Sequence, residues 1–279
     1  MSVLSGQARL AGLLGWPVAH SRSPRLHGFW LERYRIDGAY LPLPVRPDSL
    51  APALHGLLAC GFQGCNVTSP HKEAAFALCD TRTDPARRVG VVNTLVFRDG
   101  RIHGSSTDGA GFLANLRDHG IDPSAGPALL LGAGGATRDI AAALLDSGAK
   151  VAISNRTPER AAALTRLLPA LSVIAWERRS AALADRALVV NTTSAGMAGT
   201  PPLKVDFSRA APSLVVADIL YVPLLTPFLA AARAHGLTTV GGLGMLLHQA
   251  VEGFTAWFGV HPAVDRELFN FVASDLAAS

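Results

Sequence analysis

The chain has 279 residues, of which 49% are hydrophobic and 16% charged, with 27 glycines and 18 prolines. This composition is typical of a globular protein rich in turns, and the length predicts two domains. No apolar run approaches the roughly 18 residues of a membrane span, and the N-terminus lacks the basic region of a signal peptide. We therefore expect a cytoplasmic protein that does not bind membranes.

The formal net charge of +4 is spread along the chain, without a basic stripe interleaved with aromatic residues. This pattern argues against a nucleic-acid partner and suits an anionic small molecule. The three cysteines, Cys60, Cys65 and Cys79, show no C-x-x-C spacing, so we expect reduced thiols. The nine histidines show no paired metal-ligand spacing, so we expect no metal.

The first part of the chain alternates short apolar strands with helices, which predicts an α/β layer. A hairpin is expected where Asp99-Gly100 separates two apolar segments. The strands are expected at residues 8–14, 39–45, 62–68, 91–97 and 101–103, and the helices at 24–34 and 50–59.

The segment NVTSPHK, residues 66–72, predicts a strand end followed by a helix. Pro70 suits the first helical position and Ser69 the N-cap, which puts Lys72 near the positive end of the helix dipole. Three interpretations compete for Lys72: a solvated surface lysine, the lysine of an S-x-x-K acyl-transfer motif, and a catalytic acid or base. The acyl-transfer interpretation is weak, because the S-D-N and K-T-G elements of those enzymes are absent.

A second α/β series follows the Pro/Gly-rich residues 122–127. Its apolar runs are typical of buried parallel strands, and two helical patterns close the chain. We expect these closing helices to return to the first domain. The strands are expected at 128–131, 150–154, 188–191 and 214–219, and the helices at 136–147, 158–168, 245–258 and 263–277.

The segment Gly132-Ala133-Gly134-Gly135-Ala136 lies between a strand and a helix. Such a loop lets backbone amides approach a pyrophosphate, although Thr137 replaces the third glycine of the G-x-G-x-x-G pattern. Because the strand–loop–helix–strand context is complete, we predict a dinucleotide site.

The residues after the next strand indicate which dinucleotide is bound. An NAD site would place Asp or Glu about 20 residues beyond the loop. This chain instead has Asn155-Arg156-Thr157-Pro158-Glu159-Arg160, with Thr157 and Pro158 opening a helix. Arg156 and Arg160 suit a 2′-phosphate, so the predicted cofactor is NADP(H).

Polar residues at strand ends and helix starts of the first domain predict a second site. Ser21 and Ser23 precede a helix that Ser23 is expected to cap, and they could hold a carboxylate. Asn66 and Thr68 alternate along a strand and could share one face. With Asn93 and Asp108, they predict a site for a small polyhydroxylated acid.

Motifs along nearly the whole chain, in the same order, resemble those of the shikimate dehydrogenase family. They are SRSP (21–24), NVTSPHK (66–72), VGVVNTL (89–95), STDG (106–109), GAGGA (132–136), NRTPER (155–160), NTTSAG (191–196) and GLGMLLHQA (242–250). The resemblance implies an N-terminal α/β substrate-binding domain (1–107 with 246–279) and a Rossmann-like NADP-binding domain (108–245). It also implies an enzyme of aromatic amino acid biosynthesis that interconverts 3-dehydroshikimate and shikimate, as a monomer or, preferably, a homodimer.

The resemblance also implies roles for individual residues. Lys72 would be the proton donor in reduction and the acceptor in oxidation, with Asp108 as its partner carboxylate. The implied substrate-binding residues are Ser21, Ser23, Asn66, Thr68, Asn93, Asp108, Tyr221 and Gln249. The implied cofactor-binding residues are Gly132, Ala133, Gly134, Gly135, Ala136, Asn155, Arg156, Thr157, Arg160, Thr192, Ile219 and Gly242.

Ser69, Ser106 and Gly241 depart from the family pattern, with expected effects on affinity or loop geometry. Two alternatives stay open. A quinate/shikimate dehydrogenase with broader substrate and cofactor use is disfavoured by Ser23 and the two arginines. A catalytically silent NADP-binding regulator would not need to retain Lys72 and Asp108.

Overall fold

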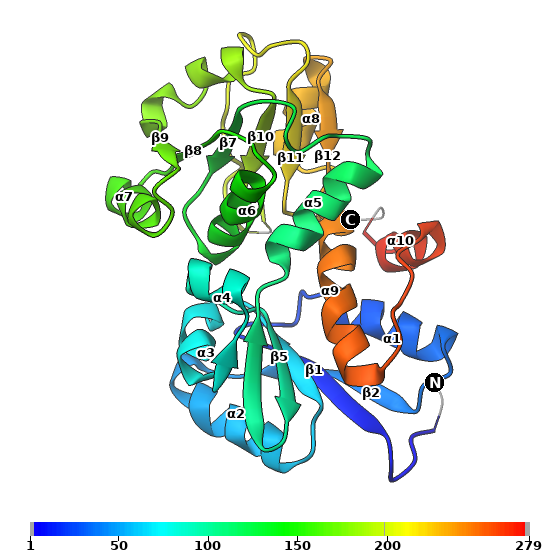
Figure 1. Ribbon diagram of the computed structural model, residues 1–279. Helices are drawn as coiled ribbons and strands as arrows, with labels where there is room; N and C mark the ends of the chain where they lie inside the picture. Colours follow the sequence, from blue (N-terminus) through cyan, green and yellow to red (C-terminus); the bar gives the residue numbers. More distant parts are fainter. Residues whose placement is uncertain (1–2, 198, 277–279) are drawn as a thin grey trace. The chain divides into compact units, whose positions relative to one another are not determined.

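A computed structural model describes residues 3–197 and 199–276. The chain forms two compact units (Figure 1). Unit 1 consists of the chain up to Thr107 together with Gln249–Val272, and unit 2 of Asp108–His248 together with the chain from Ala273. Each unit is built around one six-stranded sheet, in agreement with the predicted two-domain α/β class.

The sheet of unit 1 is mixed, in the order β2-β1-β3-β5-β6-β4. Its strands are β1 (Arg9–Gly15), β2 (Gly38–Pro44), β3 (Gly64–Val67), β4 (Thr81–Arg82), β5 (Thr94–Arg98) and β6 (Arg101–Ser105). β1 runs parallel to β2 and β3, whereas β5 is antiparallel to β3 and β6. The predicted hairpin is present, and Asp99 and Gly100 adopt the positive φ values, 53° and 70°, that a type I′ turn requires.

Helices cover both faces of this sheet (Figure 1). α2 and α3 pack their buried residues Leu54 and Ala75 with Leu14 and Leu95 of the strands. The other side carries Trp30 of α1 and Phe254 of α9, whose rings lie 5.1 Å apart. The helices are α1 (Ser23–Arg33), α2 (Leu50–Ala59), α3 (Lys72–Leu78), α4 (Asp84–Val89), α9 (Leu243–Phe258), α10 (Arg266–Ala273) and the 3-10 turn η1 (Pro47–Ser49).

The two closing helices were predicted, and most of their length, Gln249–Val272, lies in unit 1; the start of α9 up to His248 and the chain from Ala273 group with unit 2. α9 begins two residues before the predicted start, and α10 is shorter than the predicted helix over 263–277. The last residue of that prediction, 277, lies outside the described residues.

The predicted start of α3 is wrong. The helix begins at Lys72, and its N-cap residue is His71, whose side chain makes no capping bond. Ser69 and Pro70 are joined by a cis peptide bond and lie in a turn that the His71 amide closes by donating to the Thr68 carbonyl at 3.0 Å. This is the arrangement of a type VI turn, so neither Ser69 nor Pro70 belongs to the helix.

The sheet of unit 2 is entirely parallel, in the order β12-β11-β10-β7-β8-β9. Numbered along this unit, that order is 3-2-1-4-5-6 read from β9, the doubly wound arrangement of dinucleotide-binding folds. The strands are β7 (Ala128–Leu131), β8 (Val151–Ser154), β9 (Ser172–Val173), β10 (Leu188–Asn191), β11 (Val215–Asp218) and β12 (Thr238–Val240). The helices are α5 (Asp108–Asp118), α6 (Gly135–Asp146), α7 (Pro158–Leu167) and α8 (Pro227–Ala234), with 3-10 turns η2 (Trp176–Arg178) and η3 (Ala181–Asp185).

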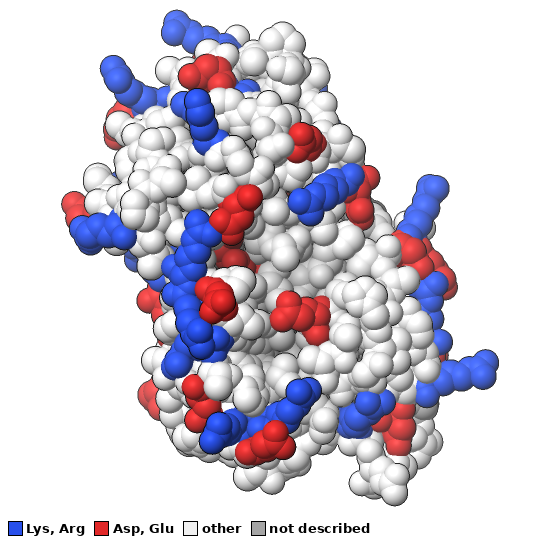
Figure 2. All heavy atoms as spheres, in the orientation of Figure 1, with Lys and Arg blue, Asp and Glu red and all other residues white. Residues whose placement is uncertain are grey.

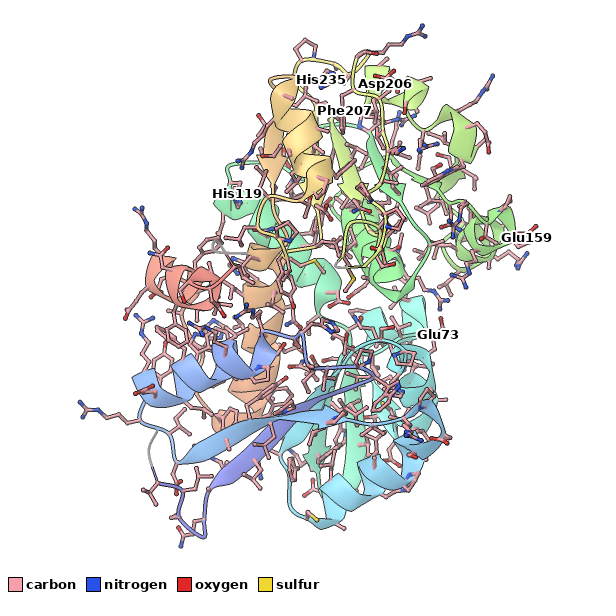
Figure 3. The ribbon with its side chains drawn as sticks, turned by 180° about the vertical axis from the view of Figure 1, so that it is seen from behind. Glu73, His119, Glu159, Asp206, Phe207 and His235 are labelled. Atoms are coloured by element: carbon pink, nitrogen blue, oxygen red, sulfur yellow. The ribbon has the colours of Figure 1, made fainter. Side chains whose placement is uncertain are left out.

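The core of unit 2 lies between the sheet and its helices. Phe228 of α8 packs with Leu129 and Val189 of the sheet. Its ring also contacts Phe207, and Figure 3 shows Phe207 beside His235 at one end of this unit. No helix in the described part of the chain is long and apolar enough to cross a membrane.

Candidate active site

The two serines expected to bind a carboxylate lie together at the start of α1. The Ser21 hydroxyl lies 3.3 Å from that of Ser23, and it accepts the Ser23 amide at 3.2 Å. The predicted N-cap role of Ser23 is wrong, because Ser23 is already helical and Arg22 is the N-cap. The physical reason is that the Ser21 hydroxyl already accepts the Ser23 amide, so the helix can start one residue earlier.

Asn66 on β3 is buried, and its amide group is held from three sides. The Tyr40 hydroxyl donates to Asn66 Oδ1 at 2.6 Å. Asn66 Nδ2 donates to the Asn93 carbonyl at 3.2 Å and to Thr94 Oγ1 at 3.0 Å. Both amide hydrogens are therefore used, and the group has only acceptor capacity left on Oδ1.

Asn93 and Gln249 are coupled through Thr107. Asn93 Oδ1 accepts the Thr107 amide at 2.9 Å, and Asn93 Nδ2 donates to Thr107 Oγ1 at 3.0 Å and to Gln249 Oε1 at 3.3 Å. The Thr107 hydroxyl donates to the Gln249 carbonyl at 2.9 Å. All three side chains are buried, so this network fixes the part of α9 that belongs to unit 1 against the segment that follows β6.

The remaining predicted residues of unit 1 follow β3. Thr68 is half-buried, and its amide donates to the Leu14 carbonyl at 2.9 Å. Lys72 is the half-buried first residue of α3 and is followed by Glu73, which Figure 3 labels.

Asp108 and Tyr221 belong to unit 2. Asp108 is the buried first residue of α5, whose start is held by a bond of 2.9 Å from the Gly109 amide to Asp139 Oδ2. Tyr221 is half-buried and follows β11. Because Lys72 and Asp108 lie in different units, their pairing stays a prediction.

The glycine loop of unit 2 has the geometry that a dinucleotide needs. Gly132 follows β7 with φ +130°, and a Cβ there would lie 2.5 Å from Thr192 Oγ1. Gly134 is the extended N-cap of the twelve-residue helix α6, and a Cβ there would meet nothing within 4 Å. The loop lies at the C-terminal ends of β7 and β10, where the strand order reverses. Ligands of doubly wound sheets bind at this switch point, with pyrophosphate at the helix start.

Thr137, at the third glycine position, ties this loop together. Its Oγ1 accepts the Gly134 amide at 3.0 Å and lies 2.8 Å from Thr192 Oγ1. Thr192 donates its own hydrogen to the Leu131 carbonyl at 2.8 Å, so Thr137 must be the donor to Thr192. The result is a directed chain from Gly134 to Leu131 that crosses the switch point.

The segment after β8 fits the predicted 2′-phosphate site. Thr157 is the N-cap of α7 and Pro158 its first residue, as predicted. Asn155 Nδ2 donates to the Thr157 carbonyl at 2.9 Å, which shapes the turn. Arg156 and Arg160 are exposed, and Figure 3 labels Glu159 between them on α7. These cations suit an additional phosphate.

Asp218, at the end of β11, organises the segment that carries Ile219 and Tyr221. Its carboxylate accepts the Leu220 amide at 3.0 Å, the Thr226 hydroxyl at 2.7 Å and Asn191 Nδ2 at 3.1 Å. Burial nevertheless raises the pKa of Asp218 to about 6.

Gly242 lies against Ile219 in the same unit, because a Cβ on Gly242 would be 2.3 Å from the Ile219 carbonyl oxygen.

Among residues 3–197 and 199–276, no group of three or more His, Cys, Asp or Glu side chains could hold a metal ion. On the face shown in Figure 2, basic and acidic side chains are intermixed.

Six residues of these networks have no predicted role in the sequence. Thr107 and Thr137 adjoin predicted residues and could have been found from that proximity. Tyr40 and Asp139 lie in no recognised motif, so only the fold reveals them. The six are Tyr40, Thr94, Thr107, Thr137, Asp139 and Asp218.

The doubly wound sheet, its glycine loop and the two arginines define the class of dinucleotide-binding proteins. Family models narrow this class. A model described as the shikimate dehydrogenase substrate binding domain matches residues 13–95. One described as shikimate / quinate 5-dehydrogenase matches 120–219, and one described as the shikimate 5′-dehydrogenase C-terminal domain matches 242–266.

Whole-chain comparisons agree with these models. The NADP(+) shikimate dehydrogenase of Acidiphilium cryptum is 66% identical over 274 residues, which cover 98% of this chain and 99% of the relative. The crystal structure of shikimate 5-dehydrogenase from Thermus thermophilus, in complex with NADP(H) and shikimate, is 36% identical with a TM-score of 0.87. That match covers 96% of this chain and 99% of the other. The chain belongs to the shikimate dehydrogenase family.

The hydroxyl of Thr137 is expected to support cofactor binding. Thr137→Val keeps the side-chain shape but breaks the chain of hydrogen bonds that holds the glycine loop. We expect KM for NADP+ to rise roughly 3- to 10-fold, the effect of losing about one hydrogen bond, with KM for shikimate within about twofold. Steady-state kinetics would measure both constants. Thr137→Ser keeps the hydroxyl and is the control; equal effects of the two substitutions would contradict the assignment.

The buried Asp218 predicts a pH dependence of stability. Its folded pKa of about 6 lies above the usual unfolded value, so the stabilisation from its protonated form is present below about pH 4 and is lost as pH rises through 6. Asp218→Asn cannot titrate, so its stability relative to the unchanged protein should increase between pH 4 and 7, by up to roughly 3 kcal/mol. Urea unfolding across this pH range would measure the difference, with exposed Glu177→Gln as control. A difference that does not change with pH would contradict the prediction.

Proposed function

We propose that this protein catalyses the reversible NADPH-dependent reduction of 3-dehydroshikimate to shikimate, a step toward the aromatic amino acids. The observation that carries this conclusion is the match of the whole chain to a structure solved with both NADP(H) and shikimate. The two half-sites, a glycine loop and a network of hydroxyl and amide groups, are what such a reaction requires.

Unit 1 would bind the substrate and unit 2 the cofactor. The match of the substrate binding domain model to residues 13–95, within unit 1, supports this division. We place the functional boundaries at 1–107 with 246–279 and at 108–245. The enzyme would be cytoplasmic, as its three free thiols suggest, and a monomer or, preferably, a homodimer.

The residues of unit 2 fit NADP(H), which supplies the hydride when bound. The amides at the start of α6 would hold the pyrophosphate, because they lack acceptors within their own helix. Arg156 and Arg160 would bind the 2′-phosphate, with Asn155 and Thr157 shaping the turn between them. Thr192, Ile219 and Gly242 would line the rest of the cofactor site.

The residues of unit 1 would fix the substrate by its polar groups. The adjacent hydroxyls of Ser21 and Ser23 would donate to the carboxylate of shikimate. Asn66 Oδ1 would accept from a ring hydroxyl, since its two N–H groups are already used. Further contacts would come from Thr68, Asn93 and Gln249 of unit 1, and from Asp108 and Tyr221 of unit 2.

Lys72 would manage the proton. Negative charge builds on the substrate oxygen as the ketone is reduced, and an ammonium group beside that oxygen can supply both charge and proton. We assign this role to Lys72, which would take the proton back during oxidation. Asp108 would orient the amine.

Substrate and cofactor preference test the proposed function directly. Steady-state rates would be measured with shikimate and quinate, each with NADP+ and NAD+. A quinate dehydrogenase from Corynebacterium glutamicum, solved with NAD, is 29% identical to this chain with a TM-score of 0.87. We expect shikimate with NADP+ to be preferred; a preference for quinate with NAD+, or no activity with any pair, would refute the proposal.

The role of Lys72 is tested by Lys72→Ala. Loss of the proton donor should lower kcat by at least about 100-fold, the usual contribution of general acid–base catalysis, while Kd for NADPH changes less than about threefold. Turnover and NADPH fluorescence titration would measure the two effects. Lys150→Ala, which removes an exposed lysine, should leave both unchanged. Turnover within about tenfold of normal in Lys72→Ala would exclude this residue as the acid.

A further inference from the structure

A buried pair of aromatic rings lies next to Asn66, one of the predicted substrate-binding residues of unit 1. The ring of His27 on α1 stacks on the ring of Tyr40 on β2, with centroids 3.9 Å apart and an interplanar angle of 6°. Further aromatic rings enclose the pair, namely Trp30, Phe254 and Trp257. This packing restricts the Tyr40 ring to one position.

The Tyr40 hydroxyl is hydrogen-bonded to one residue of the predicted substrate site. It donates to Asn66 Oδ1 at 2.6 Å, which fixes the position of that buried side chain. Burial raises the pKa of Tyr40 well above its ordinary value, so the hydroxyl keeps its proton and can donate. Tyr40 therefore holds the amide that is predicted to bind a ring hydroxyl.

His27 contributes a ring without contributing charge. It is 0% exposed, and burial lowers its pKa to about 3, so it is neutral near pH 7. Asn66 lies near it, but neither imidazole nitrogen has a partner of hydrogen-bond geometry among the described residues. Burying unpartnered nitrogens costs free energy, and His27 gains no hydrogen bond in return. Its stabilising contact with Tyr40 is therefore the stacking of the two rings.

We propose that Tyr40, held by His27, is a positioning residue for substrate binding that acts through Asn66. The Tyr40 hydroxyl, together with the Asn93 carbonyl that accepts from Nδ2, holds the Asn66 amide in one orientation and so directs the remaining acceptor capacity of Oδ1 to the substrate. Without that hydroxyl, Oδ1 loses the donor that orients it, and the amide is held only by its Nδ2 bonds to the Asn93 carbonyl and Thr94 Oγ1. This inference rests on the proposed function, because it takes shikimate to be the substrate.

Tyr40→Phe tests the inference, because it removes the hydroxyl and keeps the stacked ring. We expect KM for shikimate to rise about 5- to 20-fold, while kcat and KM for NADP+ stay within about threefold. Tyr34→Phe is the matched control. It also removes one hydroxyl in unit 1, which accepts the Ala263 amide at 2.9 Å, and it should leave KM for shikimate unchanged.

A double-mutant cycle separates positioning from general stability. If Tyr40 acts through Asn66, Tyr40→Phe should have little further effect on KM for shikimate once Asn66→Ala is present. An additive effect, or an unchanged KM in Tyr40→Phe alone, would overturn the inference.

The variant His27→Phe tests whether His27 acts through ring stacking, because it keeps an aromatic ring against Tyr40. KM for shikimate should stay within about twofold of normal, because only the unpartnered nitrogens are lost. If KM for shikimate in His27→Phe rose as much as in Tyr40→Phe, His27 would not act only by stacking its ring on Tyr40. Failure of the proposed function is distinguishable, since the unchanged protein would then form no NADPH with shikimate.

Discussion

The structure of unit 1 depends on the requirement that buried polar groups be hydrogen-bonded. Asn66 and Asn93 lie inside the unit, where an unpaired amide would cost more than a hydrogen bond returns. Their partners come from Tyr40, Thr94 and Thr107, which no ligand needs to touch. The polar site therefore exists as a preformed network, and its geometry is set by the strands that carry those partners.

Unit 2 meets a comparable requirement with the backbone. A dinucleotide loop must bring amides close to phosphate groups while keeping one conformation. Glycine at positions 132 and 134 permits the close approach, and Thr137 supplies the restraint that a third glycine could not. Close approach and rigidity thus come from different residues of one short segment.

Much of this arrangement was predictable from the sequence. The bounds of β7 and β10 were predicted correctly, because continuous apolar runs end sharply at polar or glycine residues. The start of α3 was not, since Pro70 fits both a helix start and a cis-proline turn and only tertiary contacts distinguish them. Tyr40 was missed for a related reason. Its role arises from β2 lying beside β1, and from β1 lying beside β3, which no local pattern encodes.

The engagement of both Asn66 N–H groups has a consequence for substrate selectivity. Since both of its N–H groups are engaged, Asn66 in the proposed substrate site would distinguish ligands by the direction of a proton: it would accept a hydroxyl that points its hydrogen at Oδ1. A carbonyl or ether at the same place would present lone pairs to lone pairs, and its oxygen would receive no donor from Asn66. Polar sites reject such analogues far more strongly than apolar pockets reject a missing methylene. In the proposed site, the strands of unit 1 would thus determine which ring oxygens of the substrate must carry hydrogen.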